Sequence, residues 1–229
     1  MRDPLPLMIF AAGFGTRMRA LTAARPKPLI PVLGRPLIDR ALDLAREAGC
    51  APVVANTHYL GQMIAEHLSG TGVLISDEAG EILETGGGLK KALPLLPGPA
   101  VMTLNPDAVW RGPNPLALLR AAWDPERMDA LLLVQDAARV KGRSAKADFV
   151  LAPDGRIERA AGRGGVLYLG AQVVKTAPVA DRPEQVFSLN TVWDGMIAAG
   201  RAHGLSYEGD WCDVGSPEGL TEAEAMLGA

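Results

Sequence analysis

A short apolar run that leads straight into glycines decides the fold: Leu7-Met8-Ile9-Phe10-Ala11-Ala12-Gly13-Phe14-Gly15-Thr16-Arg17-Met18. We interpret residues 5–12 as a buried strand, because an apolar run bounded by turn residues is typical of a strand covered on both faces. The glycines behind it expose backbone amides that can hold phosphate oxygens, and small residues let a nucleotide approach the chain closely. The stretch therefore predicts a strand followed by a phosphate-binding loop.

Two other kinds of phosphate loop do not fit this stretch. A Walker A loop requires Gly-x-x-x-x-Gly-Lys-Ser/Thr, which the chain lacks, and a dinucleotide fingerprint requires a third glycine where Met18 stands. A plain glycine turn without a ligand stays open as an alternative. Arg17 and Lys27 favour the phosphate loop, because a turn that needs only conformational freedom has no use for cations beside it.

Strands and helices alternate outward from the loop as far as residue 135. The apolar periodicity predicts strands over 52–56, 72–76, 100–104 and 130–135, and helices over 36–48, 60–68, 83–93 and 115–123. This alternation is typical of an α/β protein. We therefore expect a Rossmann-like, mostly parallel sheet with helices on both faces.

The pattern changes after residue 141. Short antiparallel strands are expected over 148–151 and 156–159, joined by a turn at Pro153-Asp154-Gly155, and helices over 189–199 and 217–227 close the chain. No internal repeat or linker divides the sequence. We expect residues 1–229 to form a single domain with two halves, 1–135 and 136–229.

The composition narrows the range of partners. The 229 residues are 48% hydrophobic, and 23 basic against 26 acidic residues give a net charge of −3, which would not attract nucleic acid or an anionic membrane. Cys50 and Cys212 lie far apart, so neither a zinc site nor a disulfide framework is implied. With no apolar run of about 20 residues, we expect a cytoplasmic protein, a monomer or a weak homodimer.

Several segments resemble the signature of the sugar-1-phosphate nucleotidylyltransferases: residues 11–19, 21–22, 26–32 and 34–38. Further segments are similar to one branch of that family, the N-acetylmuramate α-1-phosphate uridylyltransferases of peptidoglycan recycling: residues 83–88, 90–93, 105–107, 147–149, 187–190, 193–194 and 211–218. The resemblance runs the whole length of the chain. It implies a GT-A-like nucleotidyltransferase fold, with a nucleotide-binding half over 1–135 and a sugar-binding half over 136–229.

The implied reaction joins a sugar 1-phosphate oxygen to the α-phosphorus of a nucleoside triphosphate, UTP in this branch, and releases pyrophosphate. A phosphate monoester is largely dianionic at neutral pH, since its second pKa is about 6, so no general base is needed. The resemblance implies that Asp107 and Asp213 bind Mg²⁺, and that Arg17, Lys27 and Asp107 are catalytic. By position alone, the two aspartates could equally be a turn residue and a helix cap.

The resemblance also implies which residues contact the nucleotide, mostly small ones that permit close approach: Ala11, Ala12, Gly13, Gly15, Thr16, Thr85 and Gly86. Asn56 and Gln62 are weaker candidates for the base, because a strand-end turn and a solvated helix face explain them as well.

A second group of residues is expected to contact the sugar phosphate, and its types suit hydroxyl and acetamido groups: Asn105, Asp148, Gly170, Asn190 and Asp213. Asp148 could equally be a surface residue of a hairpin, and Trp193 and Trp211 fit a hydrophobic core better than a sugar platform. A muramyl sugar carries a lactyl carboxylate. The nearest cations in the sequence are Arg143, Lys146 and Arg163, which could also be solvated loop charges.

The chain departs from the family pattern at Ala20, Pro106 and Cys212. Pro106 matters most, because it removes an amide and fixes φ beside the expected metal ligand. Three alternatives stay open: a guanylyltransferase acting on mannose 1-phosphate, a thymidylyl- or uridylyltransferase acting on glucose 1-phosphate, and a non-catalytic nucleotide-sensing domain, since fold does not fix function. The presence of Arg17, Lys27, Asp107 and Asp213 together argues against a non-catalytic domain.

Overall fold

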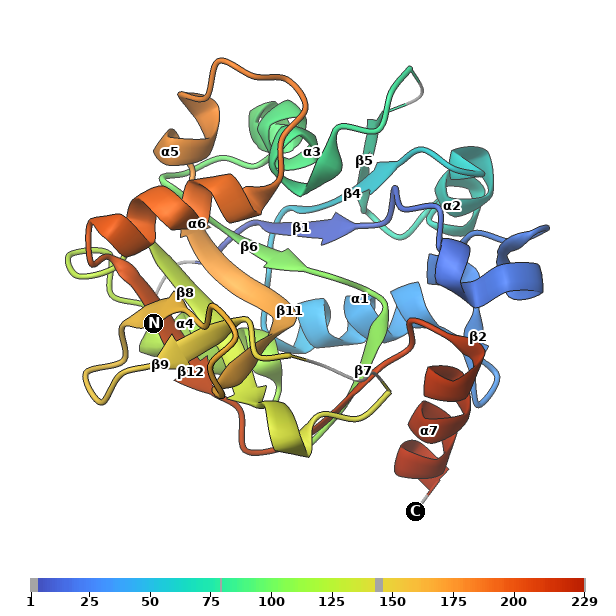
Figure 1. Cartoon of the computed structure of the whole chain (residues 1–229). Helices are drawn as coiled ribbons and strands as arrows, with labels where there is room; N and C mark the ends of the chain where they lie inside the picture. Colours follow the sequence, from blue (N-terminus) through green and yellow to red (C-terminus); the bar gives the residue numbers. More distant parts are fainter. Residues whose placement is uncertain (1–3, 79, 143–145, 229) are drawn as a thin grey trace.

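A nine-stranded sheet forms the centre of the computed structural model, which describes residues 4–78, 80–142 and 146–228 (Figure 1). Its strands are β1 (Leu7–Phe10), β4 (Val53–Thr57), β5 (Leu74–Asp77), β6 (Ala100–Leu104), β8 (Ala130–Asp136), β9 (Phe149–Leu151), β10 (Ile157–Arg159), β11 (Val166–Lys175) and β12 (Ala202–Ser206). β6, β1, β4 and β5 are parallel neighbours. β11 runs antiparallel to β6 and to β8, and β8 pairs in parallel with β12. The mostly parallel sheet predicted from the sequence is confirmed.

Helices cover both faces of this sheet. On one side lie α1 (Leu37–Glu47), α2 (Gly61–His67) and α4 (Pro115–Ala122), and on the other lie α3 (Glu84–Ala92), α5 (Ala177–Ala180) and α6 (Leu189–Ala198). The strands explain why: Leu7 and Ile9 of β1 pack into the first core, while Met8 between them packs into the second. Successive side chains of a strand point to opposite faces, so a continuous apolar strand needs helices on both.

A smaller layer packs beside the sheet. It contains β2 (Pro31–Val32), β3 (Arg35–Pro36), β7 (Ala108–Arg111), β13 (Asp210–Asp213) and α7 (Pro217–Gly228). Met18, Val109 and Val214 belong to its core, together with Cys212, whose burial raises its thiol pKa to about 12. Because β7 and β13 are antiparallel partners and Val214 N donates to Asp107 O at 2.8 Å, the layer brings two distant chain segments together.

The sequence predicted the first 136 residues well and the rest less completely. All the strands and helices expected there lie within a few residues of the observed ones, but β2, β3 and β7 were missed, as were the short 3₁₀ helices η1 (Thr16–Thr22), η2 (Lys27–Leu29) and η3 (Leu93–Leu95). The 3₁₀ helix η4 (Ala137–Arg139), which follows β8, was missed as well. In the second half β9, β10, α6 and α7 were expected, whereas α5, β11, β12 and β13 were not. Gly170 explains why β11 was not predicted. Its φ is +87° and the register of β11 with β8 shifts between Tyr168 and Gln172, so a bulge interrupts the alternation of apolar and polar residues along the strand.

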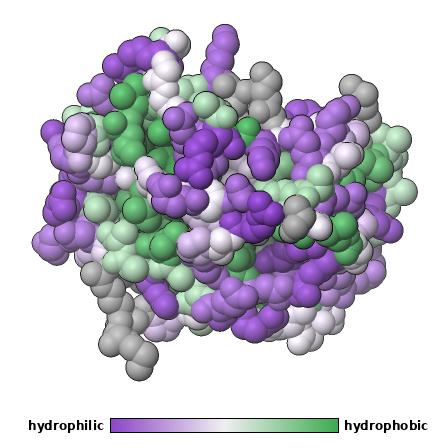
Figure 2. Space-filling model, turned by 90° about the horizontal axis from the view of Figure 1, so that it is seen from below, coloured by the Kyte–Doolittle hydropathy of each residue, from purple (hydrophilic) through white to green (hydrophobic). Residues whose placement is uncertain are grey.

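The helices of the described residues lack the combination of length and hydrophobicity that a membrane span requires. No helix there is both long and apolar enough to cross a bilayer. The face seen from below is covered mainly by hydrophilic side chains, with smaller apolar areas between them (Figure 2).

Candidate active site

Two adjoining cavities open beyond the carboxyl ends of β1, β4 and β6, where open α/β sheets bind their ligands. The first cavity has a volume of about 310 Å³ and the second about 300 Å³. Five residues line both: Phe10, Arg17, Thr85, Asn105 and Asp107. They mark a junction at which a ligand in one cavity would meet a ligand in the other.

The glycine-rich loop forms one wall of the first cavity. Gly15 has a φ of +65°, and a Cβ there would lie 2.9 Å from Lys27 Cβ, so glycine is needed for both conformation and space. Thr22 Oγ1 donates to Gly15 O at 3.2 Å, which closes the loop around η1. At its tip the Phe14 ring packs edge-on against His58, with centroids 5.6 Å apart. The loop is therefore held at Gly15 and at its tip.

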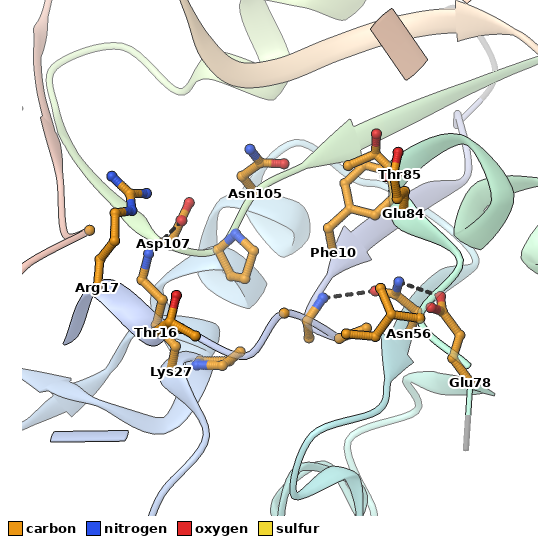
Figure 3. A pocket seen from close by; sticks show the side chains of 18 residues that line it. Phe10, Thr16, Arg17, Lys27, Asn56, Glu78, Glu84, Thr85, Asn105 and Asp107 are labelled. Atoms are coloured by element: carbon orange, nitrogen blue, oxygen red, sulfur yellow. Dashed lines mark hydrogen bonds and ion pairs between the residues drawn. The ribbon is translucent and has the colours of Figure 1, made fainter. Parts of the chain in front are cut away.

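A buried chain of hydrogen bonds supports the opposite end of the first cavity. Ala11 N donates to Asn56 Oδ1 at 2.8 Å, and Asn56 Nδ2 donates to Glu78 Oε1 at 2.6 Å (Figure 3). Leu83 N donates to the other oxygen of this carboxylate, Glu78 Oε2, at 3.1 Å. Glu78 is only 1% exposed. The Glu78 carboxylate thus orients Asn56, and Asn56 fixes the first amide of the loop. Sequence reasoning singled out Asn56 weakly and missed Glu78.

Charged side chains gather at the junction (Figure 3). Lys27 Nζ lies 2.6 Å from Asp107 Oδ2 and is largely buried, whereas Arg17 is 66% exposed and its Nη1 lies 3.7 Å from Asp213 Oδ2. A Cβ on Gly215 would come within 2.7 Å of Asp213 Oδ2, so glycine leaves room for these groups. Lys27 is held in place, while Arg17 remains able to move onto a ligand.

Asp107 and Asp213 are suited to a divalent cation. Both line the second cavity, and their chain segments are joined by the Val214 to Asp107 hydrogen bond. Among the described residues no group of three or more His, Cys, Asp or Glu side chains could hold a metal. A pair of carboxylates matches Mg²⁺, which binds through one or two carboxylates and completes its shell with phosphates and water.

The second cavity is built from side chains and one bulged strand. Gly170 O accepts from Asn105 N at 2.8 Å, and a Cβ on Gly170 would lie 2.9 Å from Asn105 Cβ. Asp148 Oδ2 accepts from Tyr168 N at 3.0 Å, so this aspartate is tied to the cavity wall. Trp193 and Trp211 are buried and also line the cavity, which makes them both core and wall.

Most residues predicted from the sequence line these cavities. The first is lined by Ala11, Ala12, Gly13, Gly15, Thr16 and Lys27, and the second by Asp148, Gly170, Asn190 and Asp213, with Arg17, Thr85, Asn105 and Asp107 on both. Gly86 does not line either: its N–H donates to Phe187 O at 2.8 Å, and a Cβ would lie 2.3 Å from the Phe187 ring. Its neighbour Thr85 accepts from Leu189 N at 3.0 Å through Oγ1.

The other predicted residues lie elsewhere. Gln62 donates to Glu66 on the exposed side of α2 and lines neither cavity. Lys146 and Arg163 do not line the second cavity either, and Arg143 falls outside the described residues. Arg159, which sequence reasoning did not select, does line it. In the sequence it looks like one more hairpin charge, so no local signal could have found it.

Residues 7–204 match the model of the MobA-like NTP transferase domain, and the chain belongs to that family. The chain is therefore a nucleotidyltransferase, as its resemblance predicted. It is 39% identical to the N-acetylmuramate alpha-1-phosphate uridylyltransferase of Caulobacter vibrioides, over 98% of this chain and 97% of that protein. It is 34% identical to the enzyme of the same name from Neisseria meningitidis, over 97% and 98% respectively.

The fold is shared with solved nucleotidyltransferases of much lower identity. The inositol-1-phosphate CTP transferase from T. maritima superposes with a TM-score of 0.81, at 16% identity, over 98% of this chain and 95% of that one. At this identity the likeness speaks for the fold alone.

Proposed function

We propose that this chain transfers a uridylyl group from UTP to N-acetylmuramate α-1-phosphate, yielding UDP-N-acetylmuramate and pyrophosphate. The observation that carries the proposal is the end-to-end similarity to two relatives with that name, at 39% and 34% identity. The reaction would belong to peptidoglycan recycling in the cytoplasm. Two cavities that meet at a charged junction suit a reaction between two anionic substrates.

The residues at the junction supply what this reaction needs. A phosphate oxygen of the sugar 1-phosphate forms a bond to the α-phosphorus while the bond from that phosphorus to the bridging oxygen breaks, and pyrophosphate leaves with the electron pair. The nucleophile is already anionic, so the requirement is alignment and neutralisation of charge. Lys27, held beside Asp107, meets the α-phosphate, and the exposed Arg17 closes on the β- and γ-phosphates.

Asp107 and Asp213 would hold Mg²⁺ in this proposal. When bound, the ion supplies positive charge that offsets the negative charge of the two phosphate groups. The carboxylates keep this charge at the junction, and the Lys27 ammonium beside Asp107 prevents an excess of negative charge in the free enzyme.

The two cavities divide recognition between base and sugar. The backbone over 11–13, fixed through Asn56, and the Thr85 hydroxyl suit a pyrimidine edge, because groups on or near the backbone permit close approach. Asn105, Asp148, Gly170 and Asn190 suit the hydroxyl and acetamido groups of the sugar.

Pyrophosphate release tests the proposal directly. Each of UTP, CTP, GTP and dTTP is paired with N-acetylmuramate, N-acetylglucosamine, glucose and mannose 1-phosphates in the presence of Mg²⁺. We expect the highest kcat/KM for UTP with N-acetylmuramate α-1-phosphate, and no turnover after chelation of the metal. Preference for GTP with mannose 1-phosphate would overturn the substrate assignment. No pyrophosphate with any pair would instead indicate a nucleotide-sensing role.

A further inference from the structure

An arginine that does not belong to the junction lines the second cavity. Arg159, the last residue of β10, lines the second cavity but not the first. Its guanidinium carbon lies 5.0 Å from the centroid of the Phe149 ring and 5.9 Å from that of Trp193. Packing against two aromatic faces restricts the side chain and favours its charge.

Hydrogen bonds fix the direction in which this guanidinium points. Its Nε donates to Asp194 Oδ1 at 2.8 Å, Nη1 donates to Asn190 Oδ1 at 2.9 Å, and Nη2 donates to Asn190 O at 2.9 Å. A guanidinium has five N–H groups. Within the described residues these bonds leave one N–H on Nη1 and one on Nη2, so the guanidinium keeps donors for an anionic ligand.

The carboxylates around the second cavity would repel an acidic ligand, so such a ligand needs the positive charge of Arg159 to bind there. Three carboxylates line the cavity, those of Asp107, Asp148 and Asp213. Among the described lining residues Arg17 is the other basic group, and it belongs to the junction, where the phosphates meet. An anionic substituent on the sugar would therefore be repelled unless it reached Arg159. The partner of Arg159, Asp194, is 58% exposed, so water weakens its competing charge.

We infer that Arg159 is the specificity-determining residue that binds the carboxylate of the lactyl ether on the sugar. The inference rests on the proposed function and goes beyond it by naming the group that distinguishes a muramyl from a glucosaminyl sugar. The lactyl ether stands at the 3-position, two ring carbons from the anomeric carbon that carries the phosphate. With the phosphate at the junction, the sugar ring and its substituent occupy the second cavity, whose lining includes Arg159.

Arg159 also holds Asn190, so a merely structural role must be separated from recognition. If the arginine only positions Asn190, its replacement lowers turnover of every sugar phosphate alike. If it binds the carboxylate, the loss is confined to ligands that carry the carboxylate. The methyl ester of the lactyl group provides the comparison ligand, since it removes the charge of the substituent and adds only one methyl group.

The experiment compares kcat/KM for N-acetylmuramate 1-phosphate, its methyl ester and N-acetylglucosamine 1-phosphate, with UTP, in the wild type, Arg159→Gln and Arg163→Gln. In the wild type we expect the acid to exceed the ester roughly 10- to 100-fold, the range for a hydrogen bond to a charged group. Arg159→Gln should bring this ratio close to one. Arg163 has 57% of its side chain exposed and does not line the second cavity, so Arg163→Gln should keep the ratio of the wild type.

Two results would overturn the inference and leave the proposed function intact: equal use of acid and ester by the wild type, or an unchanged ratio in Arg159→Gln. The first needs no variant, so misfolding of Arg159→Gln cannot hide it. A wild type that ignores N-acetylmuramate 1-phosphate but uses another sugar phosphate would overturn both.

Discussion

The two cavities recognise their ligands by different means. Half of the lining of the first comes from a continuous stretch, the loop behind β1 with η1 and η2, and this stretch offers backbone groups and small residues beside Arg17 and Lys27. The second takes most of its side chains from elements of the second half of the chain, β9, β10, β11, α6 and β13. A backbone site depends on the fold of one loop, whereas a side-chain site can be altered one residue at a time. We therefore expect changes in the first cavity to affect every reaction of the enzyme, and changes in the second to affect the choice of sugar.

The junction belongs to both cavities, and the largest effects are expected there. Asp107→Asn and Asp213→Asn should each lower kcat more than about 1,000-fold, because a metal ion contributes several kcal/mol of charge stabilisation that a neutral amide would not secure. The measurement is Mg²⁺-dependent pyrophosphate release, with circular dichroism as the control for folding. Retention of most of the rate by either variant would remove that aspartate from the proposed metal site.

Lys27→Ala tests whether the fixed cation acts on the transition state. We expect kcat to fall about 100- to 1,000-fold, the usual effect of losing a group that faces developing charge, with little change in the KM for UTP. Steady-state kinetics with UTP varied at saturating sugar phosphate separates the two parameters. A raised KM at an unchanged kcat would make Lys27 a binding residue and would contradict the assignment.

Glu78→Gln should affect the first cavity alone. The amide group of glutamine would face either the Asn56 amide or the Leu83 N–H, both donors, so one hydrogen bond to a charged acceptor is lost. Such a bond contributes about 1.5–3 kcal/mol. We expect about a tenfold rise in the KM for UTP, a lowered melting temperature and an unchanged KM for the sugar phosphate. Equal rises in both KM values would contradict the assignment of Glu78 to the first cavity.

Gly170→Ala is the counterpart in the second cavity and the smallest of the four effects. The residue has a φ of +87°, and the new Cβ would lie 2.9 Å from Asn105 Cβ. A left-handed conformation costs alanine about 1–2 kcal/mol, so we expect roughly a fivefold rise in the KM for the sugar phosphate. Gly195→Ala in α6, where a Cβ meets nothing within 4 Å, is the control. If Gly170→Ala raised the KM for UTP more than the KM for the sugar phosphate, the assignment of the second cavity to the sugar would be contradicted.

Elements set by local sequence patterns could be predicted, and features that depend on tertiary packing could not. The strand over 100–104 coincides with β6, and the helix over 36–48 differs from α1 by a residue or so at each end, because local apolar patterns decide such elements. β11 was missed because the bulge at Gly170 breaks its alternation. Glu78 and Arg159 were missed for another reason: in the sequence they are ordinary charges, and only tertiary packing makes one buried and the other part of a cavity.

The contact between α3 and the segment before α6 links the two cavities mechanically. Phe187 O accepts from Gly86 N at 2.8 Å and from Gly87 N at 3.0 Å, and Leu189 N donates to Thr85 Oγ1. The first turn of α3 and the entry to α6 are therefore hydrogen-bonded into one unit. In this unit Thr85 lines both cavities, and Ser188 and Leu189 line the second. A triphosphate that orders this unit reduces the entropy still to be lost when the sugar phosphate binds. By thermodynamic linkage, UTP changes the affinity for the sugar phosphate by the same factor by which the sugar phosphate changes the affinity for UTP.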